Sequence, residues 1–177
     1  MYVRRMADAV VCVLRRQDGS DWEYITGNGG KQMKISTKGR YALRMMLDLA
    51  QYKDSGYVSL KDISRRQGIS KKYLEQIVSL LNKSDFLLAN RGYQGGYMLA
   101  RSPETYTVGE ILRLTEGSLA PVACLDQEPV MCERSADCAT LPIWQGLNRV
   151  INEYLDGITL RDVLEQQKAC EIDNYMI

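Results

Sequence analysis

With 177 residues, 45% of them hydrophobic, the chain is long enough for one or two small domains with a packed core, and its formal net charge of +1 favours no particular partner. It contains no histidine, which excludes Ser-His and Cys-His catalytic pairs and imidazole ligands for a metal. No stretch is long and apolar enough to span a bilayer, so we expect a soluble, cytoplasmic protein with no membrane partner. We also expect no enzymatic activity.

Residues 1–32 show no convincing amphipathic period, so we predict an N-terminal extension outside the fold. The four residues ahead of Met33, Gly29 to Gln32, can be encoded by GGAGGAAAGCAG, which contains a purine-rich ribosome-binding site. Met33 is therefore a candidate for the true start of translation. A genuine flexible extension is the alternative.

From Thr37 the hydrophobic pattern becomes regular and predicts three helices. The first ends near the turn residues 53–56 and carries a stripe of buried side chains, which are Ala42, Met45, Met46, Leu49 and Ala50. Ser59 can cap a second, short helix with Leu60 and Ile63 facing inward. Gly68 can take a positive φ after that helix, and Ser70 can cap the next one, so the two helices meet at a sharp angle.

The third helix has two different faces. Its apolar residues fall at i, i+3, i+4 and i+7 and form a buried stripe of Leu74, Ile77, Val78 and Leu81. Its polar residues face outward, where side chains can reach phosphates or base edges when a helix lies in a major groove. These outward residues are Lys71, Lys72, Glu75 and Gln76.

Two short apolar runs, 86–89 and 97–100, flank the glycine-rich segment 90–96 and predict a two-stranded wing. Residues 33–101 contain 13 Lys and Arg against 5 Asp and Glu, a net charge of +8, whereas residues 102–177 contain 5 against 13, a net charge of −8. A basic half with a helix-turn-helix pattern is typical of a protein that binds double-stranded DNA. The expected fold is mainly α with a small β wing, and residues 33–101 form the winged helix-turn-helix domain.

Residues 102–166 are predicted to hold a linker helix, a cysteine loop and a dimerisation helix, ahead of a C-terminal tail of residues 167–177. A capping box at 107–110 opens the linker helix. Pro142 opens a long helix that runs to Gly157, and one face of it carries Ile143, Leu147, Val150, Ile151 and Tyr154. This favours a homodimer on a palindromic operator; packing within the chain is the alternative. Thr159 can cap a last short helix through Leu164.

Cys124, Cys132 and Cys138 lie within the irregular segment 117–140. Three thiols so close on flexible backbone can converge on one metal centre. The loop is too polar to be core, a disulfide would leave one thiol unpaired, and the short C-x-x-C knuckle typical of zinc is absent. From spacing alone, an iron-sulfur or other metal centre, a thiol redox switch and no special role all stay open. Cys12 and Cys170 are assigned no role.

Together these features resemble the Rrf2 family of bacterial winged-helix regulators, over about Met33 to Gln166. The segments that match are the opening 33–44, the helix 69–76, the wing 91–97 and the cysteine triad ahead of 142–144. The resemblance also supports Met33 as the start. It implies DNA contacts at Ser70, Tyr73, Glu75 and Gln76, a minor-groove contact at Arg91, and cluster ligands at Cys124, Cys132 and Cys138.

The resemblance implies an iron-sulfur cluster, with a 2Fe-2S cluster as the first choice and 4Fe-4S as the second. The fourth ligand is not specified. Seven residues separate the first two cysteines, against five in the best-known cluster-holding members, Leu141 replaces the histidine of one branch, and Arg40 replaces the acid of another. The remaining candidates are an acid of the partner protomer, a small thiol, or one of Asp126, Glu128, Glu133 and Asp137.

The predicted function is therefore a homodimeric DNA-binding transcriptional regulator that senses cluster status, or redox or nitrosative signals, through the cysteine loop. Ligation would order the loop and bias the spacing or tilt of the two recognition helices. The alternative is a cluster-free regulator of cysteine or sulfur metabolism controlled by a partner protein, which does not need the triad. A small iron-sulfur electron carrier is a distant alternative, because a basic wing would then have no purpose.

Overall fold

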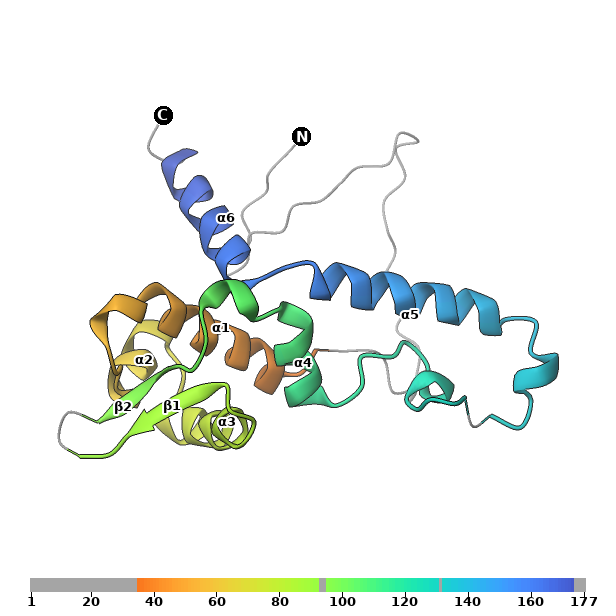
Figure 1. The fold of residues 1–177 in the computed structure, drawn as a ribbon, viewed down its shortest axis with the longest axis horizontal. Coiled ribbons are helices and arrows are strands. Elements are labelled where there is room, and N and C mark those ends of the chain that lie inside the picture. The colour runs from red at the N-terminus through yellow and green to blue at the C-terminus, as the bar shows by residue number, and fades with distance from the viewer. Residues whose placement is uncertain (1–34, 93–94, 131, 174–177) are drawn as a thin grey trace. The chain divides into compact units, whose positions relative to one another are not determined.

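The computed structural model describes residues 35–92, 95–130 and 132–173. The extension predicted for residues 1–32, the start proposed at Met33 and the final residues of the C-terminal tail lie outside these ranges. The described residues form a mainly helical fold with a two-stranded wing, as predicted (Figure 1). Its elements are α1 (Thr37–Gln51), α2 (Leu60–Gln67), α3 (Lys71–Lys83), β1 (Leu87–Asn90), β2 (Gly96–Leu99), α4 (Val108–Glu116), α5 (Leu141–Asp156) and α6 (Leu160–Asp173).

The cap residues predicted from the sequence begin the helices as expected. The Ser59 hydroxyl accepts a hydrogen bond from the Asp62 amide at 3.2 Å, and the Ser70 hydroxyl accepts one from the Tyr73 amide at 3.3 Å. Gly68 has a φ of 64° between α2 and α3. The capping box at Thr107 opens α4. These local signals fix the helix-turn-helix because each cap satisfies amides that the helix itself leaves without partners.

The core lies against α1. Both predicted stripes, on α1 and on α3, are buried. Tyr106, Ile111 and Leu160 are also fully buried and belong to the same core, so α4 and the first residue of α6 cover α1. The core therefore continues past Arg101, and the boundaries of the predicted domains stay a prediction.

The wing is an antiparallel pair in which Leu87 is opposite Leu99. The two strands each differ by one residue from the predicted runs, and Phe86 packs against Tyr106 with ring centroids 5.4 Å apart. Val58 joins the wing through two backbone hydrogen bonds with Tyr97, both 2.9 Å long. A Cβ on Gly96 would lie 2.5 Å from the Val58 carbonyl oxygen, so this close approach requires glycine.

The long helix of the second half, α5, is not buried in the core as α1 and α3 are. The predicted limits of α5, at Pro142 and Gly157, are confirmed to within a residue. No residue of α5 is buried, and it contacts α4 and the 3-10 turn at Ala123–Leu125. The prediction that the last helix ends at Leu164 is wrong, because α6 continues to Asp173 without a Gly or Pro that would stop it. Among the described residues, no helix combines the length and apolar character that crossing a bilayer requires.

Candidate nucleic-acid interface and cysteine loop

The polar face of α3 is open to solvent. Of the DNA-contacting residues predicted on or just before this helix, five are exposed, and these are Ser70, Lys71, Lys72, Glu75 and Gln76. The Lys71 ammonium lies 3.8 Å from the Glu75 carboxylate, an exposed pair that competing contacts to DNA can replace. The helix therefore presents donors, acceptors and positive charge on one side and apolar residues on the other.

Tyr73 differs from the other predicted contacts because it is half-buried. Its ring packs edge-on against Tyr41 of α1, with centroids 5.5 Å apart and an interplanar angle of 78°. Tyr73 therefore ties the first turn of α3 to α1 in addition to the DNA contact that the family resemblance implies.

A buried carboxylate holds the end of α2 against α1. Asp48 is 2% exposed, and the guanidinium of Arg66 donates to both of its oxygens, at 2.9 and 2.6 Å. Gln67 donates a third hydrogen bond to Asp48 at 3.0 Å. The hydrogen bond to Asp48 raises the pKa of the Arg66 guanidinium, which also lies 4.1 Å from the centroid of the Tyr52 ring. These contacts join the end of α2, just ahead of the turn into α3, to α1.

Sequence reasoning did not identify this network. Its one local signal is the position of Asp48, which lies between Met45 and Leu49 on the buried stripe of α1. A charged residue at such a position needs a partner, because an unpaired buried charge is costly. The identity of the partner, eighteen residues away, follows only from the fold.

Arg91 is exposed at the start of the wing tip. The next residue, Gly92, has a φ of 120°, and its carbonyl accepts a hydrogen bond from the Gly95 amide at 3.0 Å. Residues 93 and 94 lie outside the described part of the chain. The backbone on either side of them turns tightly enough to place Arg91 at the edge of the wing.

The three loop cysteines are free, half-buried thiols. Cys124 and Cys132 line the same hollow, of about 410 Å³, together with Ala123, Asp126 and Gln127. Cys138 is not part of that lining. Within the described ranges, no three Cys, Asp or Glu side chains lie close enough together to hold one metal ion. The structure thus brings two of the three predicted ligands to one hollow and leaves the third apart.

Cys138 lies just ahead of α5. Its sulfur is 3.5 Å from the hydroxyl oxygen of Thr140, and this hydrogen bond, with the backbone amides of Thr140 and Leu141, lowers the pKa of the Cys138 thiol. A lower pKa favours the thiolate, which is the form of cysteine that binds metals. Of the four acids considered as a further ligand, Asp126 is the one that lines the hollow of Cys124 and Cys132.

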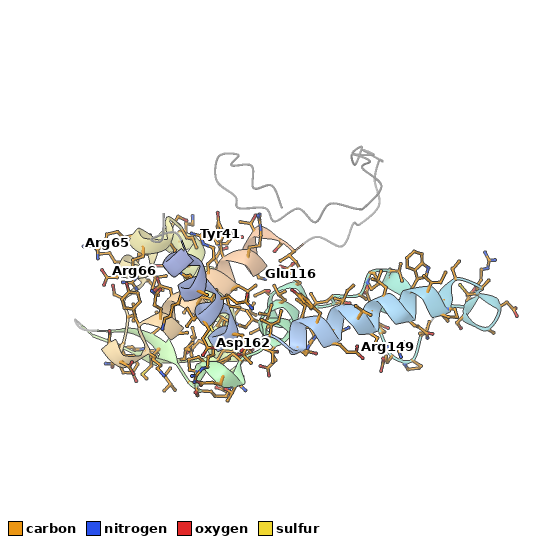
Figure 2. All side chains as sticks on the ribbon, turned by 90° about the horizontal axis from the view of Figure 1, so that it is seen from above. Tyr41, Arg65, Arg66, Glu116, Arg149 and Asp162 are labelled. Atoms are coloured by element: carbon orange, nitrogen blue, oxygen red, sulfur yellow. The ribbon has the colours of Figure 1, made fainter. Side chains whose placement is uncertain are left out.

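Glu116 connects the cysteine loop to the helix-turn-helix. It is the last residue of α4, labelled in Figure 2, and its carboxylate accepts hydrogen bonds from the Ser36 amide at 3.2 Å and the Ser36 hydroxyl at 2.7 Å. Ser36 caps α1. Gly117, the residue after Glu116, begins the cysteine loop and has a φ of 84°. One turn earlier in α4, Arg113 donates to Asn152 of α5 at 2.7 Å and pairs with Asp156.

A helix-turn-helix with an exposed polar third helix, followed by a two-stranded wing, defines a winged-helix DNA-binding protein. The chain belongs to the Rrf2 family, because the family model described as "Iron-dependent Transcriptional regulator" matches residues 35–166. It is thus a DNA-binding transcriptional regulator, and the family is not one of enzymes. The individual roles of the DNA-contacting residues and of the cysteines stay predictions.

Known relatives cover most of the chain. The protein Rrf2 of Nitratidesulfovibrio vulgaris is 39% identical over 138 residues, which span 78% of this chain and 91% of that protein. The solved structure of T. potens IscR is 42% identical with a TM-score of 0.61, over 76% of this chain and 88% of IscR. The structure of CymR, the global cysteine regulator of B. subtilis, is 39% identical with a TM-score of 0.62, over 75% of this chain and 97% of CymR.

Proposed function

We propose that this protein is a homodimeric regulator that binds a palindromic operator and senses iron-sulfur cluster status through Cys124, Cys132 and Cys138. The observation that carries the DNA-binding part is the exposure of the polar side chains of α3 opposite a fully buried apolar face. Because the apolar face of α3 is covered by its own chain, the exposed polar face is the part of this helix that is free to contact another molecule.

The exposed apolar face of α5 supports the dimer. Four large side chains on it are open to solvent: Ile143 at 62%, Leu147 at 42%, Val150 at 58% and Tyr154 at 68%. A contiguous apolar stripe of this kind in a soluble domain marks an interface. A second copy of α5 is the partner that suits it, because a two-fold axis between the winged regions matches the symmetry of a palindrome.

The thiols support the cluster. Cys124 and Cys132 share one hollow with Asp126, and Thr140 promotes the thiolate form of Cys138. Closing of the loop, which contains the turns at Ala123–Leu125 and Ser135–Asp137, would bring Cys138 to the other two cysteines. A bound cluster would supply an oxidant-labile centre that keeps the loop closed. We infer Asp126 as the fourth protein ligand.

The residues that would transmit the loop's state are Glu116 and Arg113. Glu116 joins the start of the loop to the cap of α1, and α1 in turn contacts α3. Arg113 joins α4 to α5, the proposed dimer helix. A change in loop order would therefore act on both the recognition helix and the spacing between protomers.

Anaerobic purification with iron and sulfide analysis tests the cluster. The expected result is coloured protein with visible charge-transfer absorption that Cys132→Ser abolishes and Cys170→Ser, the matched thiol control, leaves intact. Asp126→Ala should shift the absorption or speed iron loss, whereas Asp137→Ala should not. Full iron and sulfide content in Cys132→Ser would contradict the proposed ligand set.

Operator mapping tests the recognition helix. Glu75 can accept a hydrogen bond from a cytosine amino group, so Glu75→Ala should relax discrimination at one operator position by roughly 1–3 kcal/mol while binding to random DNA holds. We expect Lys71 and Lys72 to hold phosphates. An equal loss on operator and random DNA would show that Glu75 acts through folding.

A second candidate is a cluster-free regulator of sulfur metabolism controlled by a partner protein. The observations that favour it are the similarity to CymR over 97% of that chain and the separation of Cys138 from the other two cysteines. Colourless, iron-free protein that still binds its operator fully after anaerobic purification would support this candidate over the cluster.

A further inference from the structure

Arg44 of α1 was not among the predicted DNA contacts, yet it is tied to the turn that leads into the recognition helix. Its Nε donates to the Gln67 side-chain oxygen at 3.2 Å, and its Nη2 donates to the Gln67 backbone carbonyl. Gln67 is the last residue of α2, followed by the turn at Gly68 and the cap at Ser70. Arg44 is thus anchored directly beside the N-terminal end of α3.

The side chains around Arg44 extend this anchoring to α3 itself. The Arg44 guanidinium carbon lies 5.5 Å from the centroid of the Tyr41 ring, and Tyr41 packs edge-on against Tyr73 in the first turn of α3. Figure 2 labels Tyr41 on the part of the molecule that holds the helix-turn-helix and the wing (the winged part), where Arg65 and Arg66 are also labelled. The guanidinium therefore has a defined place relative to the recognition helix.

The charge on Arg44 is not neutralised by these contacts. Both acceptors on Gln67 are uncharged, and within the described part of the chain no carboxylate forms an ion pair with Arg44. Arg66 and Arg65 differ from it, because Arg66 pairs with Asp48 and Arg65 pairs with Asp62. Arg44 is also exposed to solvent. A fixed, unpaired cation at this place is suited to an anion outside the protein.

We propose that Arg44 binds a DNA backbone phosphate at the edge of the groove that receives α3. In helix-turn-helix proteins the N-terminal residues of the recognition helix contact base edges, and the first helix of the motif, here α2, crosses the phosphate backbone. Arg44 is bonded to the last residue of α2. An arginine has five N–H donors, so two hydrogen bonds to Gln67 leave donors for a phosphate. Because Gln67 already holds the side chain, little further rotamer freedom is lost on binding.

The proposal rests on DNA binding alone and does not depend on a cluster. It is tested by the salt dependence of binding to operator and random DNA, with Arg44→Ala compared with Arg149→Ala in the full chain. Arg149 is an exposed arginine on α5, away from the winged part (Figure 2). Each lost phosphate contact should reduce the slope of log affinity against log salt by about 0.9, so a dimer that loses one contact per protomer should lose about 1.8. Affinity at low salt should fall roughly 10- to 100-fold on both DNAs.

Two further variants separate a phosphate contact from a structural role. Arg44→Lys keeps the charge and should retain most of the salt slope, whereas Arg44→Gln keeps a donor for Gln67 but should behave like the alanine variant. Thermal unfolding of each variant reports the fold. An unchanged slope in both neutral variants, or the same loss of slope in Arg149→Ala, would overturn the proposal. Loss of operator binding with intact random-DNA binding would also overturn it, because that result assigns Arg44 to holding the turn.

Discussion

The winged region, residues 35–116, and the loop region, residues 117–157, differ in how far their apolar side chains are buried by the chain itself. In the winged region, the stripes of α1 and α3 are covered by other elements of the same chain. In the loop region α5 has no buried residue and displays four large apolar side chains. Among the described residues, the first region buries its apolar stripes within the chain, whereas the second displays an apolar face that no described segment covers.

Polar groups do not account for this difference. Throughout the described residues, no buried side-chain nitrogen or oxygen lacks a hydrogen-bond partner. Even the buried carboxylate of Asp48 is fully bonded, and the loop region joins α4 through Arg113 and Asn152. What separates the two regions is apolar area and free thiols. These are the features that a second protomer and a metal centre would use.

The largest expected effect is on dimerisation, through changes on the apolar face of α5. Replacing Leu147→Glu together with Val150→Glu places two charges where a partner helix would have to bury them, so the dimer dissociation constant should rise by about 1,000-fold or more. Sedimentation velocity measures this. Gln145→Glu is the matched control, because residue 145 lies two positions from 143 and 147 on the helix and therefore on the opposite side. Dimers of unchanged affinity in the double variant would show that α5 is not the interface.

The next largest effect is on the free energy of unfolding, and it tests whether contacts within the chain stabilise the winged region. Asp48→Ala removes a buried carboxylate and leaves Arg66 and Gln67, which are partly open to solvent, without their shared acceptor, so the free energy of unfolding should fall by about 2–3 kcal/mol. Asp54→Ala, at an exposed position after α1, should change it by less than about 0.5 kcal/mol. Urea unfolding of both variants gives the comparison. If both cost the same, the Asp48 network does not stabilise the fold.

The comparison between regions also shows which features the sequence could predict. Caps and stripes were predicted correctly because they depend on neighbours within one or two turns, as at Ser59, Ser70 and Thr107. The irregular loop and the limits of α5 were predicted for the same reason. The strand ends moved by one residue, because pairing with Val58 and packing of Phe86 decide the register.

Contacts between distant segments could not be predicted from spacing. The bonds from Arg66 to Asp48, from Arg44 to Gln67 and from Ser36 to Glu116 join residues 18, 23 and 80 positions apart. The length of α6 was missed because its apolar pattern weakens after Leu164, while its residues remain good helix formers. For the candidate site, exposure of the α3 side chains followed from periodicity, whereas the separation of Cys138 from Cys124 and Cys132 did not.

A smaller effect is expected in the wing. Gly96→Ala adds a Cβ that would lie 2.5 Å from the backbone oxygen of Val58, and a backbone group cannot rotate away as a side chain can. Relieving the overlap should break the bridge between Val58 and Tyr97 and lower the free energy of unfolding by about 2 kcal/mol. The exchange rate of the Tyr97 amide, measured by NMR, should rise because this amide loses its hydrogen bond to Val58. Unchanged exchange and stability would show that the wing can shift freely against Val58.

The smallest effect is expected at Gly146, and it has the opposite sign. Gly146 lies inside α5, where an added Cβ meets no heavy atom within 4 Å in the single chain. Gly146→Ala in the Leu147→Glu, Val150→Glu background should therefore stabilise the helix by roughly 0.5–1 kcal/mol, measured by thermal unfolding. Residue 146 is three positions from 143 and four from 150, on the same side of the helix. A second copy packed there would meet the new methyl group, so the gain should shrink or reverse in the dimer. An equal gain in both backgrounds would place the partner helix away from Gly146.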